Sequence, residues 1–393
     1  MSKANKVTHY FSSSFKLGIL GGGQLGRMLL SETQKWDIYT CILDPTEHAP
    51  CASICNEFTQ GDLMDFETVY QFGKQVDVLT VEIEHINVKA LYKLEEEGIK
   101  VYPQPHVLEI IQHKGLQKDF YKKQAIPTAN YQRFEDLSEL QQAHFHFPIV
   151  WKSAQFGYDG MGVKVLKNKT DLASLPDIPC IIEDFITIQN EFAVIVAKNN
   201  SGETVHYPVV EMEFHDKANQ VEFVVCPAQI SQKTTDRIIE LALQIADAYQ
   251  HVGLLAIEFL QTSTGEILVN EVAPRPHNSG HYSIEASVTN QFEQHLRALL
   301  DLPLGTTDSL QYGVMVNLVG EPEYVGEVIY QNMDKILAMP GVTPHIYGKK
   351  MTRAYRKMGH VTVINNDIKK ARAIAKDVKR TLRVVGKEQI SCD

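Results

Sequence analysis

The chain has 393 residues, of which 44% are hydrophobic and 22% are charged, and its formal net charge is −10. This length predicts two to four domains with apolar cores, and the acidic balance argues against general binding to nucleic acid or to membrane surfaces. Because the N-terminus lacks the apolar core of a signal peptide and no apolar run reaches transmembrane length, we expect a soluble cytoplasmic protein.

The first part of the chain predicts a Rossmann-like α/β domain. Short apolar strands alternate there with helix-like runs, a pattern that is typical of a parallel sheet. The strands are expected at residues 15–20, 38–43, 76–83 and 99–102.

A glycine loop follows the first of these strands. Gly21, Gly23 and Gly26 fit the pattern G-x-G-x-x-G, in which backbone amides approach a phosphate. Asp44, after the second strand, resembles the acid that holds a cofactor ribose. Taken alone, these residues would suggest a nicotinamide cofactor. The rest of the chain argues against that cofactor. It favours a loop that holds a phosphate-bearing substrate or a loop that only turns the chain.

The middle of the chain predicts an α+β region with a second glycine loop. Loop 156–162 (FGYDGMG) lies between two strands and could fold over a triphosphate, while Lys152 on the preceding strand supplies positive charge. It is not a Walker A loop, and an ordinary hairpin loop is the alternative. Lys114 is a second candidate phosphate cation or else a surface lysine. The elements expected here are strands at 148–152, 162–166, 180–186, 191–197 and 204–213 and a helix at 234–249.

Acids also stand near the ends of two of these strands. The segment 183–186 could offer backbone groups to an adenine edge, with Glu191 accepting ribose hydroxyls. His215 could line the same cleft. Strand ends often carry acids and surface histidines are common, so this signal alone is poor.

The most informative segment is the apolar hairpin that carries Glu258 and Glu271, joined by the turn 263–265. Two facing carboxylates in buried strands repel one another, and a divalent cation between them resolves the conflict. Magnesium takes one or two carboxylates plus phosphate oxygens, so the hairpin predicts a metal–nucleotide site. The alternative is that each glutamate is paired with a Lys or Arg. Polar side chains follow the second strand directly: Arg275, His277 and Asn278.

The C-terminal part predicts a small third domain with strands at 314–319 and 359–364 and a helix at 367–382. Residues 347–360 form a basic run in this acidic chain, and five cations in nine residues suit a phosphate monoester. A solvated basic loop is the alternative.

In this order the motifs resemble the ATP-grasp superfamily, whose members join a carboxylate or bicarbonate to an amine through an acyl phosphate. Within it, the chain resembles the N5-carboxyaminoimidazole ribonucleotide synthases of purine biosynthesis. The segments that carry this resemblance are GGGQLGRM (21–28), VEIEH (81–85), FGYDGMG (156–162), NEVAPRPHNSGHY (270–282), QFEQHLRALL (291–300) and RKMGHVTV (356–363).

The resemblance implies an ATP-grasp fold in several parts: a disordered tail at 1–14, a Rossmann-like domain at 15–105, an ATP-grasp domain at 106–300 with a mobile lid at 130–180, and a small domain at 301–393. It also implies a homodimer. The implied activity is ATP- and bicarbonate-dependent carboxylation of aminoimidazole ribonucleotide, through carboxyphosphate and CO2. A ligase such as the formate-dependent glycinamide ribonucleotide transformylase is the alternative.

The resemblance implies the following site residues. Magnesium, or manganese in its place, would be held by Glu258 and Glu271. ATP would contact Lys114, Lys152, Gly157, Tyr158, Asp159, Gly160, Met161, Gly162, Val163, Glu183, Asp184, Phe185, Ile186, Glu191, His215, Asn270 and Glu271. The ribonucleotide would contact Gln24, Leu25, Glu82, Tyr158, Asp159, Lys349 and Arg356. Bicarbonate and its intermediate would meet Arg275, His277 and Asn278 as catalytic residues.

One segment departs from the family pattern. The usual Arg-Pro-Gly-Arg-Lys is Arg353-Ala354-Tyr355-Arg356-Lys357 here, which leaves the geometry of this loop open. Lys349 and Lys350 are adjacent, and the sequence does not decide which of them reaches the ligand.

Overall fold

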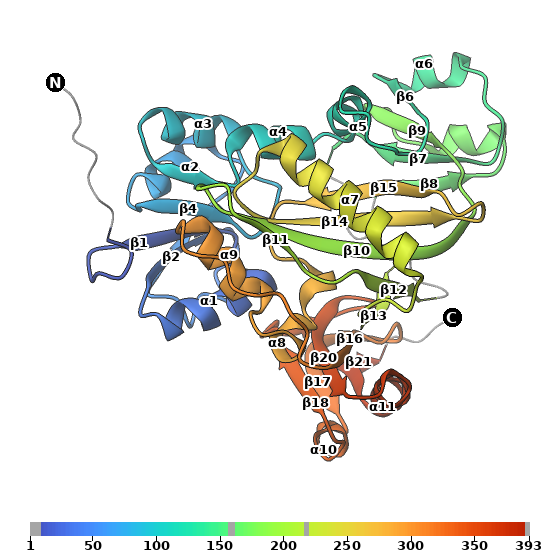
Figure 1. The fold of residues 1–393 in the computed structure, drawn as a ribbon. Coiled ribbons are helices and arrows are strands. Elements are labelled where there is room, and N and C mark those ends of the chain that lie inside the picture. Colours follow the sequence, from blue (N-terminus) through green and yellow to red (C-terminus); the bar gives the residue numbers. More distant parts are fainter. Residues whose placement is uncertain (1–8, 156–161, 216–219, 390–393) are drawn as a thin grey trace.

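The computed structural model describes residues 9–155, 162–215 and 220–389. Its N-terminal part is a five-stranded parallel sheet in the order β3-β2-β1-β4-β5, flanked by helices (Figure 1). This confirms the predicted Rossmann-like start. The elements are β1 (Lys16–Leu20), α1 (Gln24–Lys35), β2 (Tyr39–Asp44), β3 (Glu57–Gln60), α2 (Phe66–Gly73), β4 (Val78–Val81), α3 (Val88–Glu96), β5 (Lys100–Tyr102) and α4 (Pro105–Ile111).

A separate four-stranded antiparallel sheet follows, in the order β6-β9-β7-β8. Its core holds Trp151, Ile182 and Leu172. The predicted lid at 130–180 covers nearly the same residues, and its mobility remains a prediction. The elements are α5 (Lys114–Lys123), β6 (Tyr131–Phe134), α6 (Leu137–Gln142), β7 (Ile149–Ser153), β8 (Val163–Leu166), the 3₁₀ turn η1 (Lys169–Ser174) and β9 (Cys180–Asp184).

Among the described residues the largest sheet has nine strands and runs from the middle of the chain into its C-terminal part. The central strands are β10 (Ile188–Lys198), β11 (Thr204–His206), β12 (Val210–Phe214), β13 (Val221–Cys226), β14 (Gly253–Thr262) and β15 (Ile267–Ala273). Helix α7 (Gln232–Tyr249) lies across one face of this sheet (Figure 1). Phe192, Leu255 and Ile257 pack beneath the helix, because alternate strand residues point to the same face.

The C-terminal strands continue this sheet, since β13 pairs with β16. The small domain predicted at 301–393 therefore shares its main sheet with the central region. A three-stranded sheet, β19-β17-β21, completes it. The remaining elements are η2 (Asn278–Gly280), α8 (Ser283–Ala286), α9 (Gln291–Leu299), β16 (Tyr312–Val319), β17 (Tyr324–Gln331), α10 (Met333–Leu337), β18 (Val342–Ile346), β19 (Met351–Thr352), β20 (Lys357–Asn365), α11 (Ile368–Thr381) and β21 (Arg383–Gln389).

Helix α9 joins the central and N-terminal parts. Its residues Phe292 and Leu296 enter the same buried cluster as Leu17 and Leu29, which lie on β1 and α1. The helix therefore fixes the glycine loop of the first domain against the segment that follows the acidic hairpin. Figure 1 shows α9 beside β1 and α1.

Two local expectations differ from the structure. The strand expected at 204–213 is two strands, β11 and β12, because Pro208 lies between them and has no N–H to donate to a ladder. Of the tail expected to be disordered at 1–14, residues 1–8 lie outside the described part. Tyr10 and Phe11 within it contact Phe15 and Trp36 edge to face. None of the helices in the described ranges has the length and apolar character needed to cross a membrane.

Candidate functional site

The acidic hairpin forms as expected. Strands β14 and β15 are antiparallel, and Glu258 pairs directly with Glu271, followed by a β-bulge that displaces Asn270 from the regular register. Ala193 pairs with Glu258 on the other side, so Glu191, two residues away on β10, points to the same face. The three acids thus share the face of the sheet that lies opposite α7.

The carboxylates of this face have unequal environments. Burial, together with Glu271 and Glu191, raises the pKa of Glu258 to about 8. Lys114, whose Nζ lies 3.3 Å from Oε2 of Glu271, lowers the pKa of Glu271. Burial raises the pKa of Glu191 to about 7. The pairing of Glu271 with Lys114 is the alternative arrangement considered for the sequence. Nε2 of His277 lies 3.7 Å from Oε1 of Glu258, and Lys357 and Asn270 partly offset the rise in the pKa of Glu258.

The oxygen ligands on this face fit magnesium bound together with phosphate oxygens. The charge conflict between Glu258 and Glu271 is what a divalent cation would relieve. Within the described ranges, no three His, Cys, Asp or Glu side chains are grouped so that they could hold a metal ion. Two carboxylates therefore need further oxygens from a ligand, which is how magnesium binds with nucleotides.

Lys152 lies close to the hairpin through a buried charge network. Its Nζ is 2.7 Å from Oε2 of Glu183 and 3.4 Å from Oδ1 of Asn270. Lys118 lies 2.6 Å from the other oxygen of Glu183. Burial alone would raise the pKa of Glu183, but Lys152 and Lys118 together lower it. Burial likewise lowers the pKa of Lys118 to about 8. The side chain of Glu183 therefore forms an ion pair with Lys152. The sequence had predicted only a backbone role for this residue.

The rest of the expected nucleotide linker connects the four-stranded sheet to β10. Asp184 ends β9 and accepts a hydrogen bond from Asn130. Phe185 is 45% exposed, Ile186 is half-buried, and both lie between β9 and β10. An exposed aromatic ring at this junction is available to stack on a base. Adenine binding here remains a proposal.

Part of the second glycine loop borders Lys152. Val163 pairs with Lys152 across β7 and β8, and the carbonyl of Gly162 accepts the N–H of Ser153. Gly162 has φ 80, a conformation that glycine adopts without strain. Other predicted ATP and substrate contacts of this loop lie outside the described residues: Gly157, Tyr158, Asp159, Gly160 and Met161.

The polar cluster after the hairpin is held by specific partners. Arg275 forms a bidentate ion pair with Glu84, with Nε 2.8 Å and one terminal nitrogen 3.0 Å from its oxygens. Asn278 exchanges two amide hydrogen bonds of 2.9 Å with Asn317 on β16. Both side chains are thereby fixed in orientation.

The hydrogen bonds of His277 assign its proton. Nδ1 accepts the backbone N–H of Ser279 at 3.3 Å, so a neutral ring carries its hydrogen on Nε2. That hydrogen points toward Glu258. As placed here, Nε2 of neutral His277 is a hydrogen-bond donor.

The expected ribonucleotide contacts converge from opposite ends of the chain. Nζ of Lys349 donates to Oε1 of Gln24 at 2.7 Å, although 325 residues separate them. The N–H of Leu25 donates to Oε1 of Glu82 at 3.1 Å. Burial raises the pKa of Glu82 to about 7.

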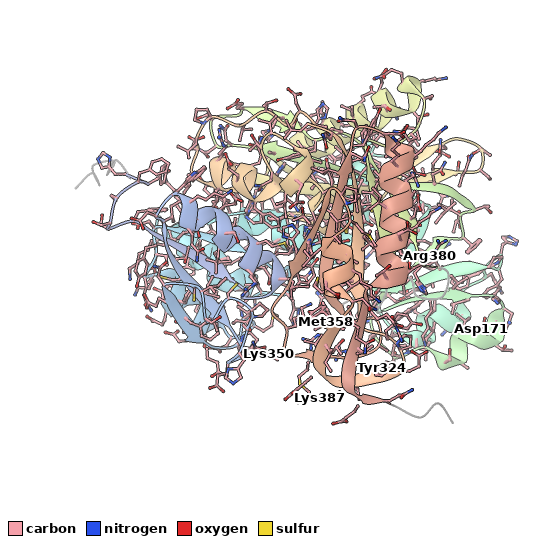
Figure 2. All side chains as sticks on the ribbon, turned by 90° about the horizontal axis from the view of Figure 1, so that it is seen from below. Asp171, Tyr324, Lys350, Met358, Arg380 and Lys387 are labelled. Atoms are coloured by element: carbon pink, nitrogen blue, oxygen red, sulfur yellow. The ribbon has the colours of Figure 1, made fainter. Side chains whose placement is uncertain are left out.

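The structure separates the two adjacent lysines. Lys349 points to Gln24, whereas Lys350 is exposed and lies at the end of the C-terminal part that also carries Tyr324 and Lys387 (Figure 2). Arg356 is half-buried and donates to the carbonyl of Met351 at 2.7 Å. Lys349 is therefore the lysine that faces the site.

The side chains of Glu82 and Asp44 pack against the first glycine loop. A Cβ on Gly21 or Gly23 would collide with the carboxylate of Glu82. Asp44 accepts the N–H groups of Gly22 and Thr46, both at 2.7 Å. These contacts occupy the acid that a nicotinamide cofactor would require for its ribose. The loop instead places Glu82 beside Gln24 and Leu25.

His215 lies farther along the sheet. It follows β12, which pairs with β10, and its ring contacts Tyr355 edge to face with centroids 5.9 Å apart. Its expected contact with ATP remains a proposal. Lys118 and Asn317 were missed in the sequence, because a helix lysine and a strand asparagine carry no local signal of the partners that they meet.

Three family models match the chain. They are the ribonucleotide synthetase preATP-grasp domain at residues 15–112, the ATP-grasp domain at 119–292, and the phosphoribosylaminoimidazole carboxylase C-terminal domain at 313–374.

Curated relatives agree with these matches. The chain is 35% identical to an N5-carboxyaminoimidazole ribonucleotide synthase of Bacillus subtilis, over 88% of this chain and 90% of that protein. It is 36% identical to a chloroplastic phosphoribosylaminoimidazole carboxylase of Vigna aconitifolia over 90% of itself. It spans only 64% of the length of that plant protein.

Solved structures share the whole fold. An N5-carboxyaminoimidazole ribonucleotide synthetase from Thermotoga maritima has a TM-score of 0.87 and 44% identity, covering 95% of this chain and 100% of that one. An N5-carboxyaminoimidazole synthase from Aspergillus clavatus, in complex with ADP and 5-aminoimidazole ribonucleotide, has a TM-score of 0.84 and 31% identity. That match covers 94% of this chain and 98% of the other.

Proposed function

The chain belongs to the N5-carboxyaminoimidazole ribonucleotide synthases of the ATP-grasp superfamily, and on that premise we propose its reaction. We propose that it uses ATP and bicarbonate to carboxylate the exocyclic amine of 5-aminoimidazole ribonucleotide, giving N5-carboxyaminoimidazole ribonucleotide. It would act as an ATP-dependent carbon–nitrogen ligase of purine biosynthesis.

One arrangement carries this proposal. The acidic hairpin and Lys152 gather groups suited to a metal-bound triphosphate, and the Lys349–Gln24 contact lies where the expected ribonucleotide residues meet. The polar cluster at Arg275 and Asn278 follows the hairpin directly and is linked by Asn317 to the sheet of the C-terminal part. A small anion held by this cluster would face both larger substrates.

In the proposed first step an oxygen of bicarbonate attacks the γ-phosphorus of ATP, the bond from that phosphorus to the β–γ bridging oxygen breaks, and ADP leaves. Lys152 and Lys114 would neutralise the transferred phosphoryl group. Magnesium held by Glu258 and Glu271 would supply further positive charge when bound. Arg275, fixed by Glu84, would present its remaining N–H groups to bicarbonate.

In the proposed second step the C–O bond of carboxyphosphate breaks and releases CO2 and phosphate. The amine of the ribonucleotide attacks the carbon of CO2 and forms the N–C bond, and its proton passes to the phosphate released in the same step. His277 would donate a hydrogen bond from Nε2–H to the developing negative charge. Water must be excluded, because carboxyphosphate hydrolyses readily.

A coupled assay of ADP release tests the reaction. ATP turnover should require bicarbonate and aminoimidazole ribonucleotide together and should yield the carbamate. Turnover that instead requires formate and glycinamide ribonucleotide would replace this function with that of the transformylase. Omitting magnesium should abolish the rate, and manganese should restore part of it.

Two further expectations accompany the function. We propose a homodimer and a cytoplasmic location, as the family resemblance and the sequence suggest. Size-exclusion chromatography with light scattering tests the dimer, and cell fractionation tests the location.

A further inference from the structure

A tight turn carries Arg356. The N–H of Arg356 donates to the carbonyl of Arg353 at 3.1 Å, which closes a four-residue turn over residues 353–356. The turn rests on Gly320, whose carbonyl accepts the N–H of Tyr355 at 2.8 Å and whose N–H donates to the carbonyl of Arg356 at 2.9 Å. A Cβ on Gly320 would overlap the carbonyl oxygen of Arg353. The turn and Gly320, which follows the last residue of β16, therefore meet backbone to backbone.

Tyr355 occupies a position in this turn that normally takes glycine or asparagine. Its φ is 59, in the left-handed region. Within the described ranges five other non-glycine residues have positive φ, and none of them is aromatic: Asp37, Ala125, Gln250, Asp301 and Asn332. Such a conformation costs about 1–2 kcal/mol for a bulky residue and persists only where its surroundings enforce it.

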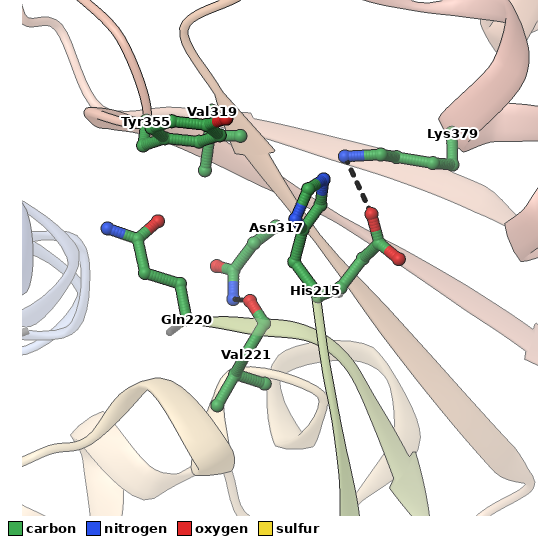
Figure 3. Close-up of a pocket in the computed structure, with 8 residues that line it drawn as sticks. His215, Gln220, Val221, Asn317, Val319, Tyr355 and Lys379 are labelled. Carbon is green, nitrogen blue, oxygen red and sulfur yellow. Dashed lines mark hydrogen bonds and ion pairs between the residues drawn. The ribbon is translucent and has the colours of Figure 1, made fainter. Parts of the chain in front are cut away.

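The ring of Tyr355 provides that enforcement. It contacts the ring of His215 edge to face at 5.9 Å and covers a small pocket that is also lined by Asn317 and Val319 (Figure 3). Asn317 is the partner of Asn278 in the polar cluster. The ring thus ties the Arg356 turn to β12 and to the strand that orients Asn278.

We propose that Tyr355 is a positioning residue: its ring, seated against His215, holds the strained turn 353–356 so that Arg356 faces the phosphate of the ribonucleotide. The proposal rests on the proposed function, which assigns that phosphate to Arg356. The role belongs to the ring and not to the hydroxyl, because the observed contact is between the two rings.

Two substitutions separate positioning from stability. Tyr355→Gly removes the ring and the strain together, so the folded state should remain stable while the turn loses its attachment. Its KM for aminoimidazole ribonucleotide should rise about tenfold, while its KM for ATP changes less than about twofold. Tyr355→Phe keeps the ring and should retain the wild-type KM values.

A double-mutant cycle with Arg356→Ala tests whether Tyr355 affects ribonucleotide binding through Arg356. If Tyr355 acts through Arg356, Tyr355→Gly should change the ribonucleotide KM by less than about twofold when Arg356 is already alanine. Full additivity, or equal effects on both KM values, would overturn the positioning role. If the wild-type protein shows no ribonucleotide-dependent turnover, the proposed function is overturned as well. If the wild-type protein turns over normally and Tyr355→Gly has unchanged KM values, this inference alone is overturned.

Discussion

Glu258 and Glu271 are direct partners across the β14–β15 hairpin, with the bulge at Asn270 beside them. Their charges conflict: burial and Glu271 together raise the pKa of Glu258 to about 8. Lys114 offsets the charge of Glu271, whereas Lys357 only partly offsets the rise in the pKa of Glu258. A hairpin of this kind costs stability in the absence of a ligand and is suited to binding a cation.

Glu271→Gln should abolish ATP turnover, because it removes one of the two carboxylates proposed for magnesium. The same change removes the counter-charge of Lys114, so the variant should stay folded but unfold at a lower temperature than the wild type. Glu266→Gln, an exposed change in the turn of the same hairpin, is the matched control and should keep full activity. A folded, active Glu271→Gln variant would refute the metal assignment.

Glu183→Gln should destabilise the protein by about 3–5 kcal/mol, because it leaves the buried Lys118 and Lys152 without their shared counter-charge. Urea unfolding measures this loss. Adding Lys118→Met to the variant removes one of the two unpaired charges and should recover a large part of the stability. If the double variant is no more stable than Glu183→Gln alone, the shared-charge account of this network fails.

Lys349→Met should raise the KM for aminoimidazole ribonucleotide by at least about tenfold, with a small effect on the KM for ATP. Lys350→Met removes the same charge from the adjacent exposed position and should change either constant less than about twofold. Steady-state kinetics of the two variants compare the lysines directly. Equal effects would show that general basic charge, and not the Gln24 contact, attracts the substrate.

Buried histidines should lower the stability below pH 6.5, and the raised pKa values of Glu82, Glu191 and Glu258 act in the opposite direction in the same window. Burial lowers the pKa of His251 to about 4 and of His295 to about 3, and it places the pKa values of His281 and His360 well below the ordinary 6.5. Between these values and 6.5 the unfolded chain binds more protons than the folded protein. Each histidine therefore costs about 1.4 kcal/mol per pH unit as the pH falls through that window.

Urea unfolding at pH 7.5, 6.5 and 5.5 measures this dependence. Stability from these histidines is fully present above pH 7. In a variant with glutamine at Glu82, Glu191 and Glu258, which removes the opposing carboxyl titrations, the midpoint should fall between pH 6.5 and 5.5. Replacing the exposed His48 with asparagine should leave the profile unchanged. A midpoint of this variant that is constant down to pH 5 would contradict the burial of these rings as neutral groups.

The sequence predicted those features that local patterns encode. Alternating apolar residues around a Ser-Thr-Gly turn predict a hairpin, and the strand period then places Glu258 opposite Glu271. A strand followed by glycines and a helix-like run predicts the Rossmann-like start. Both features depend on neighbours within about twenty residues, so one sequence suffices for them.

Other features depend on distant partners. Nothing near Lys118 shows that it is buried against Glu183, 65 positions later, and nothing near Asn317 shows that it meets Asn278. The strained conformation of Tyr355 depends on His215 and Gly320, neither of which is close in sequence. The pairing of β13 with β16, which merges two predicted domains into one sheet, is likewise non-local.

The central claim is that ATP activates bicarbonate at this site before the amine captures the carbon. Turnover with bicarbonate labelled by ¹⁸O, followed by ³¹P NMR of the released phosphate, tests it directly. The account predicts one ¹⁸O atom in each phosphate, since the attacking oxygen stays on phosphorus when CO2 leaves. Unlabelled phosphate formed together with the carbamate would contradict it.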